Sequence, residues 1–94
     1  MKIPKKIKIG GQWMDILQDK CLGAGDRAYG ECDFMRGRIV IDSNQPEDHK
    51  EVTLLHEIIE KIKNENELEI EHRNITSLAY NLHQVLKDNK LSFN

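Results

Sequence analysis

The first 42 residues show the weak apolar–polar alternation and the glycine punctuation that are typical of strands joined by turns. Two hairpins are predicted, one turning at Gly10-Gly11 and the other at Arg36-Gly37. Residues 19–30 carry three glycines and little apolar content, so we expect a loop between the hairpins. The four expected strands are Lys2–Ile9, Gln12–Gln18, Glu31–Met35 and Arg38–Asp42.

The rest of the chain changes to the 3.6-residue spacing of amphipathic helices. Pro46 lies in a polar connection and suits the first turn of a helix. We predict helices over Glu47–Lys63 and Glu71–Asn89, with a turn over Asn64–Ile70 between them. The expected fold is therefore α+β: a single domain, residues 1–94, with a small antiparallel sheet of hairpins (1–42) followed by two antiparallel helices (47–63 and 71–89).

Composition adds little chemistry of its own. The formal net charge is −2 with 32% charged residues, which gives no electrostatic bias towards nucleic acid or a membrane surface. No apolar run is long enough to cross a bilayer, and the N-terminus lacks the apolar core of a signal peptide. Cys21 and Cys32 lack CxxC spacing, so reduced thiols and a cytoplasmic location are expected.

The run His56–Glu60, with the sequence HEIIE, carries the clearest candidate chemistry. Zinc peptidases place H-E-x-x-H on a helix, where the two histidines bind the ion and the glutamate is the general base. Here Glu60 occupies the second ligand position, and glutamate is also a good zinc ligand. At 100° per residue, His56 and Glu60 lie about 40° apart, just beside the apolar arc of the first helix. That arc consists of Val52, Leu54, Leu55, Ile58, Ile59 and Ile62.

A third ligand is expected from the second helix, whose flank carries His72 and His83. These histidines are eleven residues apart, about 16 Å along a helix, so they cannot bind the same ion. In an antiparallel pair His72 lies level with Glu60, whereas His83 faces the region around Glu51. The register therefore favours His72 as the third ligand.

The predicted site has two imidazoles and one carboxylate, His56, Glu60 and His72, and keeps an open position for water, as catalytic zinc centres do. Glu57 would take a proton from that water and return it to the leaving amine. An extended peptide would pair along Arg38–Asp42, which we expect to be an edge strand. Zinc-dependent hydrolysis of a peptide bond is the predicted function.

The segments Thr53–Glu60, Glu71–Ala79 and Gln84–Asn89 resemble small phage and prophage proteins related to the minimal HExxH zinc peptidases. The resemblance covers roughly residues 38–89 and implies a zincin-like core: a small curved antiparallel sheet over an active-site helix and a following helix. It implies His56 and Glu60 as ligands and Glu57 as the base, with His72 placed by spacing alone. Glu60 departs from the histidine of standard members.

Two alternatives remain at this point. In the first, the chain is a phage accessory protein that engages a host or phage protein, and a structural or vestigial zinc site only ties the two helices together. In the second, the helix hairpin binds no metal, and Glu57, Glu60, Lys61 and Lys63 form a solvated face. The remaining notable side chains have structural interpretations. His49 is expected at the surface and His83 at the core boundary, and Trp13, Phe34 and Tyr80 are expected in the core or at its edge.

Overall fold

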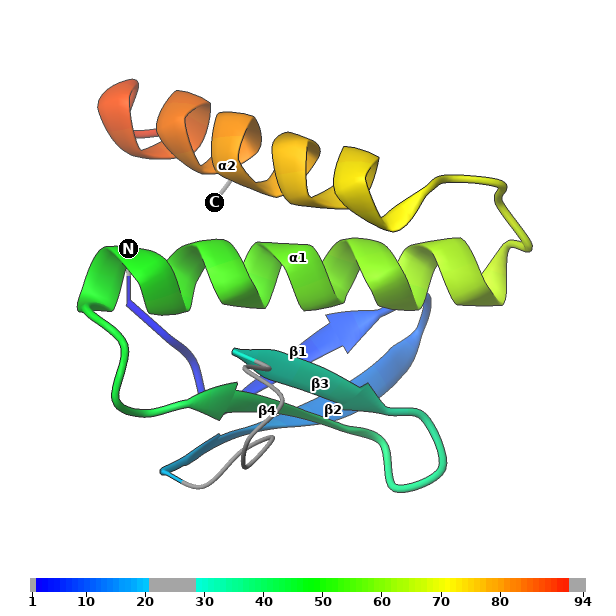
Figure 1. Ribbon diagram of the computed structural model, residues 1–94. Helices are drawn as coiled ribbons and strands as arrows, with labels where there is room; N and C mark the ends of the chain where they lie inside the picture. The colour runs from blue at the N-terminus through cyan, green and yellow to red at the C-terminus, as the bar shows by residue number, and fades with distance from the viewer. Residues whose placement is uncertain (1, 21–28, 92–94) are drawn as a thin grey trace.

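Within residues 2–20 and 29–91, the part of the chain that the computed structural model describes, four strands precede two helices (Figure 1). The strands are β1 (Lys6–Ile9), β2 (Gln12–Asp19), β3 (Gly30–Asp33) and β4 (Arg38–Asp42), and the helices are α1 (Glu47–Glu65) and α2 (His72–Asp88). The predicted α+β class and both predicted hairpins are confirmed. Cys21 and most of the predicted loop lie outside the described residues. None of the described helices is long and apolar enough to cross a membrane.

The sheet is mixed, and the prediction of a purely antiparallel sheet is wrong. Its strand order is β1-β2-β4-β3, and β2 pairs with β4 in parallel, with Ile16 opposite Ile39. The inner position suits β4 because its apolar run Ile39–Ile41 is buried throughout, whereas β3 is short and polar. The prediction that Arg38–Asp42 is an edge strand is therefore also wrong, since β1 and β3 form the edges of the described sheet.

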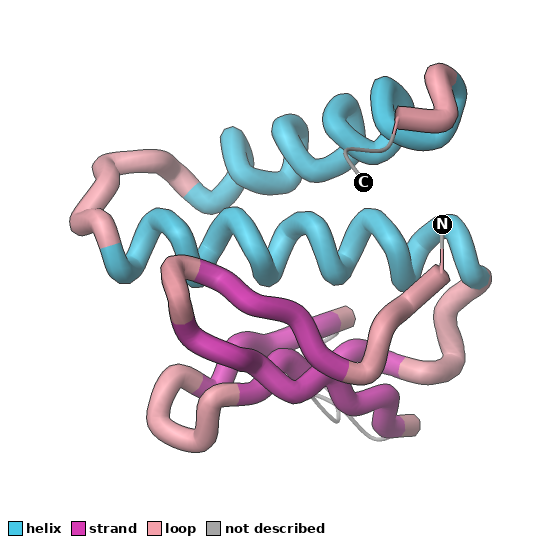
Figure 2. The backbone as a smooth tube through the Cα atoms, turned by 180° about the vertical axis from the view of Figure 1, so that it is seen from behind, coloured by secondary structure: helices cyan, strands magenta, loops and turns pink. Residues whose placement is uncertain are grey.

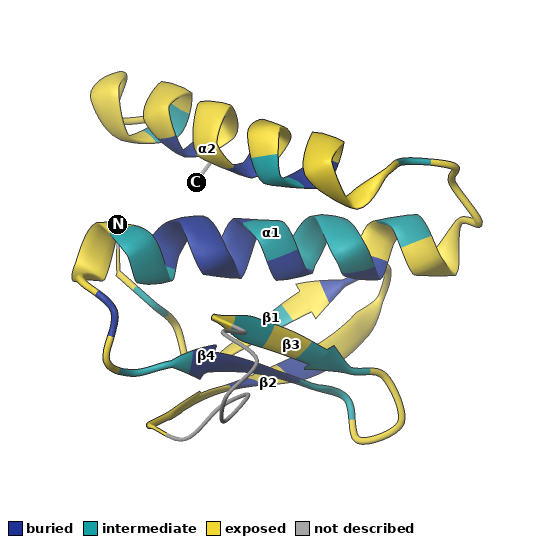
Figure 3. Ribbon diagram, viewed as in Figure 1, coloured by how far each residue is buried: buried dark blue, intermediate teal, exposed yellow. Residues whose placement is uncertain are grey.

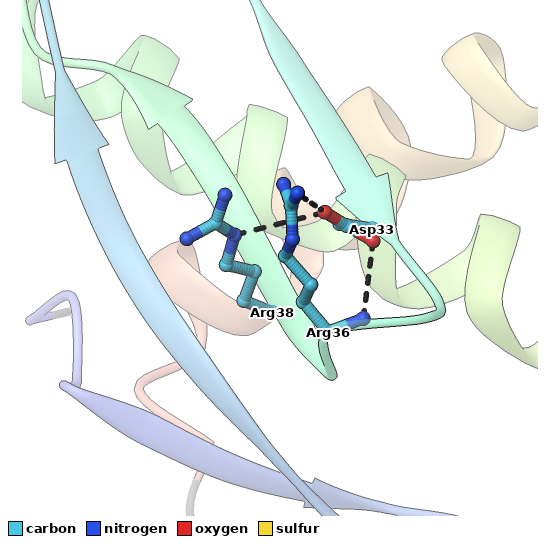
Figure 4. Close-up of polar contacts among 3 residues, drawn as sticks. All are labelled: Asp33, Arg36 and Arg38. Atoms are coloured by element: carbon cyan, nitrogen blue, oxygen red, sulfur yellow. Dashed lines mark hydrogen bonds and ion pairs between the residues drawn. The ribbon is translucent and has the colours of Figure 1, made fainter.

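The turn between β3 and β4 is held by one carboxylate (Figure 4). Asp33 Oδ1 accepts a hydrogen bond from the Arg36 backbone N–H at 3.1 Å. Its other oxygen pairs with the Arg36 guanidinium at 3.5 Å and with Arg38 Nε at 3.7 Å. Gly37 follows at φ 61°, a left-handed conformation that favours glycine. These contacts support the antiparallel register of β3 and β4, in which Asp33 lies opposite Arg38.

Helix α1 lies between the sheet and α2, as the view from behind shows (Figure 2). One apolar cluster joins Met14, Ile39, Ile41 and other sheet residues to Leu54 of α1. A second cluster, between the helices, contains Val52, Leu55 and Ala79. Helix α2 presents its outer face to solvent (Figure 3). Because α1 is covered on two sides, it buries more of its circumference than a surface helix does.

Burial on two sides explains where the predicted helix faces differ from the structure. Glu57 and Lys61 are buried, so the solvated face of the metal-free alternative is wrong at both positions. Ile62, which belongs to the predicted apolar arc, is 40% exposed. The Lys61 ammonium is paired with Glu65 at 2.6 Å and donates to Gln12 Oε1 at 3.0 Å. Three aromatic residues expected in or near the core instead lie exposed: Trp13, Phe34 and Tyr80.

The chain reverses quickly between the helices, and this reversal places the start of α2 beside the end of α1. Asn66 donates its backbone N–H to the Ile62 carbonyl, and Glu67 adopts a positive φ of 53°. The helix ends differ by no more than two residues from those predicted. Pro46 precedes α1 as its N-cap residue instead of lying within its first turn.

Candidate metal centre

The two helices bring His56, Glu60 and His72 together, as the antiparallel register predicts. His56 and Glu60 are one turn apart on α1, and His72 is the first residue of α2. One potential ligand atom from each side chain lies within 4.8 Å of those from the other two. The imidazole rings of His56 and His72 meet edge to face, with their centroids 4.8 Å apart. The two helices thus supply the three ligands of a His₂Glu zinc site.

One carboxylate oxygen of Glu60 supports metal binding most directly. Its Oε1 is buried and has no hydrogen-bond partner in the described part of the chain. An unpartnered buried carboxylate oxygen is costly, and a bound cation would satisfy it. Ligand atoms around a tetrahedral zinc lie about 3.3 Å apart, so a pair 4.8 Å apart would have to close by about 1.5 Å. His72 is exposed, which leaves its side chain room for this movement.

His56 is in the protonation state that a metal requires. Burial lowers the pKa of its imidazole, and the nearby His72 lowers it further, while Glu60 acts in the opposite direction. The ring is therefore neutral at pH 7 and can offer a lone pair to a cation.

Glu57 lies at the same level of α1, on the side that faces the sheet. It is only 7% exposed, and burial, together with the charges of Glu60 and Glu31, raises its pKa to about 7. Strand β3 approaches this point closely because residue 30 is glycine. A Cβ atom on Gly30 would lie 2.5 Å from Thr53 Cγ2 and 3.3 Å from Glu57 Cγ. The sequence places Gly30 in a loop, so this close packing is not evident before the strands are arranged.

A cavity of about 520 Å³ opens beside the trio. His56, His72 and Glu57 all line it, whereas Glu60 lines a separate hollow of about 280 Å³ with Phe34. The candidate metal centre therefore borders this cavity on the side of the two histidines and Glu57. The other described residues that line the larger cavity are Tyr29, Gly30, His49, Val52, Thr53, Thr76 and Tyr80.

Three aromatic rings form the other end of this cavity, and no sequence motif predicts them. His49 packs edge to face against Tyr29 and against Tyr80, and its Nε2 is hydrogen-bonded to the Tyr80 hydroxyl at 3.0 Å. His49 is half-buried instead of lying freely at the surface. Spacing offers a signal here, because His49 precedes His56 by two helical turns and so lies on a similar side of α1.

A second group of potential ligands, Asp48, Glu51 and His83, has a different character. His83 Nε2 is hydrogen-bonded to Glu51 Oε1 at 2.7 Å, and both side chains are buried. The Lys87 ammonium is ion-paired with Asp48, so a cation is already present in this group. The contact confirms the predicted position of His83 opposite Glu51. This contact joins the two helices far from the loop that connects them, about four helical turns before the end of α1 and about three after the start of α2.

Comparison with protein-family models, with curated proteins and with solved structures finds no match to this chain. The case for a metal centre therefore stands on the geometry of the side chains.

Proposed function

We propose that this chain is a zinc-dependent peptidase with a zincin-like core. In this proposal His56, Glu60 and His72 hold the ion, and Glu57 is the general base. Two observations carry the proposal together: Glu60 has a buried, unpartnered Oε1, and its carboxylate belongs to a trio of potential ligands with His56 and His72. A cation bound between the carboxylate and the two imidazoles would compensate the free-energy cost of burying that oxygen.

The chemistry follows from the positions of the side chains. His56, His72 and Glu60 would hold the zinc ion, which when bound would supply polarisation of a carbonyl and a lowered pKa for a coordinated water. Glu57 lines the same cavity as the two histidines, which supports its assignment as the general base. It accepts the proton of that water as the new C–O bond forms, and it delivers the proton to the amine as the C–N bond breaks.

An edge strand supports a peptide as the substrate. Strand β3 forms one edge of the described sheet, and its first residue, Gly30, lines the cavity. An extended peptide can add to such an edge through main-chain hydrogen bonds. The resemblance of residues 38–89 to small phage and prophage proteins related to the HExxH zinc peptidases agrees with this proposal. We expect a host or phage protein as the substrate and the cytoplasm as the location.

Metal content measured by mass spectrometry tests the ligands, with protein purified without a metal-affinity tag. We expect close to one zinc per chain in wild type, and its loss in His56→Ala, Glu60→Ala and His72→Ala. The matched control is His49→Ala, which removes a histidine from the same cavity outside the trio and should retain zinc. Absence of zinc from wild type, even after zinc is added, would refute the metal centre.

Hydrolysis of an unstructured protein such as casein tests the reaction. Glu57→Gln should retain zinc and lower turnover by about 10²–10⁴-fold, the usual contribution of a general base. Unchanged turnover would show that Glu57 is not the base. Stoichiometric zinc without any hydrolysis by the wild type would instead favour the alternative of a non-catalytic binding protein with a structural metal.

A further inference from the structure

The cavity has a second end, about two helical turns from the candidate metal centre. Along α1, His49 precedes His56 by seven residues, which corresponds to about 10 Å. Along α2, Tyr80 follows His72 by eight residues, about 12 Å. The His49–Tyr80 pair and the His56–His72 pair therefore both bridge the two helices, at separate points along one cavity.

The second end is built from aromatic rings held in a defined arrangement. The ring of His49 lies 5.8 Å from Tyr29 at 79° and 6.1 Å from Tyr80 at 66°, measured between centroids and planes. Tyr29 is 53% exposed and Tyr80 is 48% exposed, so neither ring belongs to an apolar core. Both tyrosine rings therefore keep exposed surface, on which a further aromatic ring can pack edge to face or offset-stacked.

The described residues that line the aromatic end of the cavity include no charged side chain. Glu57 is the one carboxylate among the described residues that line the cavity, and it lies at the metal end. No lysine or arginine is among these residues. Val52 and two threonines separate the two ends. A charged side chain would therefore find no ion-pair partner among the described residues at this end, whereas an uncharged ring needs none.

We propose that Tyr29, His49 and Tyr80 form a substrate-binding subsite that takes an aromatic side chain one or two residues from the scissile bond. An extended peptide covers about 10 Å in three residues, so a large side chain at either position spans the distance between the two ends. This inference rests on the proposed peptidase function for its link to a scissile bond. The subsite itself lies outside the metal ligands.

Peptide binding by NMR tests the subsite without requiring catalysis. The probes are acetylated, amidated pentapeptides of glycine and alanine that contain a single Phe, Leu or Lys, titrated into the zinc-free and the zinc-loaded protein. We expect the Phe peptide to bind about tenfold more tightly than the Lys peptide, with shifts at the amides of Tyr29, His49 and Tyr80. Equal binding of the Phe and Lys peptides would overturn the proposal.

Variants separate a binding role from a structural one. Tyr29→Ala and Tyr80→Ala should reduce the preference for Phe to within about twofold, while both variants keep the zinc content of wild type. Tyr80→Phe keeps the ring and loses the hydroxyl, so the preference for Phe should survive. Loss of the preference in Tyr80→Phe as well would overturn the ring-stacking subsite.

The two proposals fail in different ways. A preference for Phe in a protein that binds no zinc would support the subsite and refute the peptidase. Stoichiometric zinc with no preference for Phe would refute the subsite and leave the metal centre intact.

Discussion

Replacing the buried carboxylate of Glu57 with an amide should stabilise the metal-free protein at alkaline pH. Glu57 is 7% exposed and has no hydrogen bond within the described residues, and its neighbours Glu60 and Glu31 repel its charge. Its pKa is about 7 in the folded protein against 4.5 for an unperturbed glutamate. The folded state therefore holds a proton that the unfolded chain releases near pH 4.5, and stability falls as the pH rises from about 4.5 to 7.

The size of this effect follows from the shift in pKa. Each unit corresponds to 1.36 kcal/mol, so a rise from 4.5 to about 7 costs at most about 3 kcal/mol once Glu57 is ionised. Glu57→Gln removes this cost at nearly constant volume. We expect the variant to be about 2–3 kcal/mol more stable than wild type at pH 8 and nearly equal to it at pH 4.5.

Urea denaturation in the presence of EDTA, at both pH values, measures the difference in free energy of unfolding between variant and wild type. The matched control is Glu69→Gln, an exposed glutamate, which should leave stability within about 0.5 kcal/mol at either pH. A Glu57→Gln variant that is no more stable than wild type at pH 8 would refute the reasoning. An equal gain at both pH values would show that packing, not ionisation, causes it.

Three further predictions concern packing and metal. Gly30→Ala should destabilise the protein by about 1–3 kcal/mol in urea denaturation, because its Cβ meets the stiff, buried Thr53 side chain at 2.5 Å. His83→Ala should cost about 2–3 kcal/mol in the same assay, because it removes the buried hydrogen bond to Glu51, and an unchanged midpoint would contradict this role. EDTA should lower the melting temperature of the zinc-loaded wild type and leave that of His72→Ala unchanged, as calorimetry can show.

Local pattern was sufficient for the helices and hairpins, since each is specified within a short stretch of chain. The 3.6-residue spacing located α1 and α2, and the glycines at Gly10-Gly11 and Gly37 located the two turns. The parallel pairing of β2 with β4 was not predicted, because it depends on how the two hairpins are arranged relative to each other. The apolar–polar pattern within each strand does not specify that arrangement. The burial of Glu57 and Lys61 was missed for a related reason, since one helix was assumed to have one buried side.

Spacing was sufficient to predict that His56, Glu60 and His72 lie close together, because two of them are one turn apart on a helix and the third follows from antiparallel register. The aromatic end of the cavity was not found, because its three residues come from three separate places in the fold. Tyr29 precedes β3, His49 lies in the first turn of α1, and Tyr80 lies in the middle of α2. A histidine and two tyrosines without a shared motif give no signal until the helices are packed.

If the proposed metal binds, the position of α2 as an outer layer has a kinetic consequence for its release. Across residues 2–20 and 29–91, α2 packs on α1 and on no other helix or strand. Its detachment would expose the small cluster around Val52 and Ala79 and leave the sheet packed on α1. Such a subglobal opening costs less free energy than unfolding the whole domain. Because it carries His72 away from His56 and Glu60, the lifetime of a bound ion would be set by how often this one helix lifts, not by how stable the domain is.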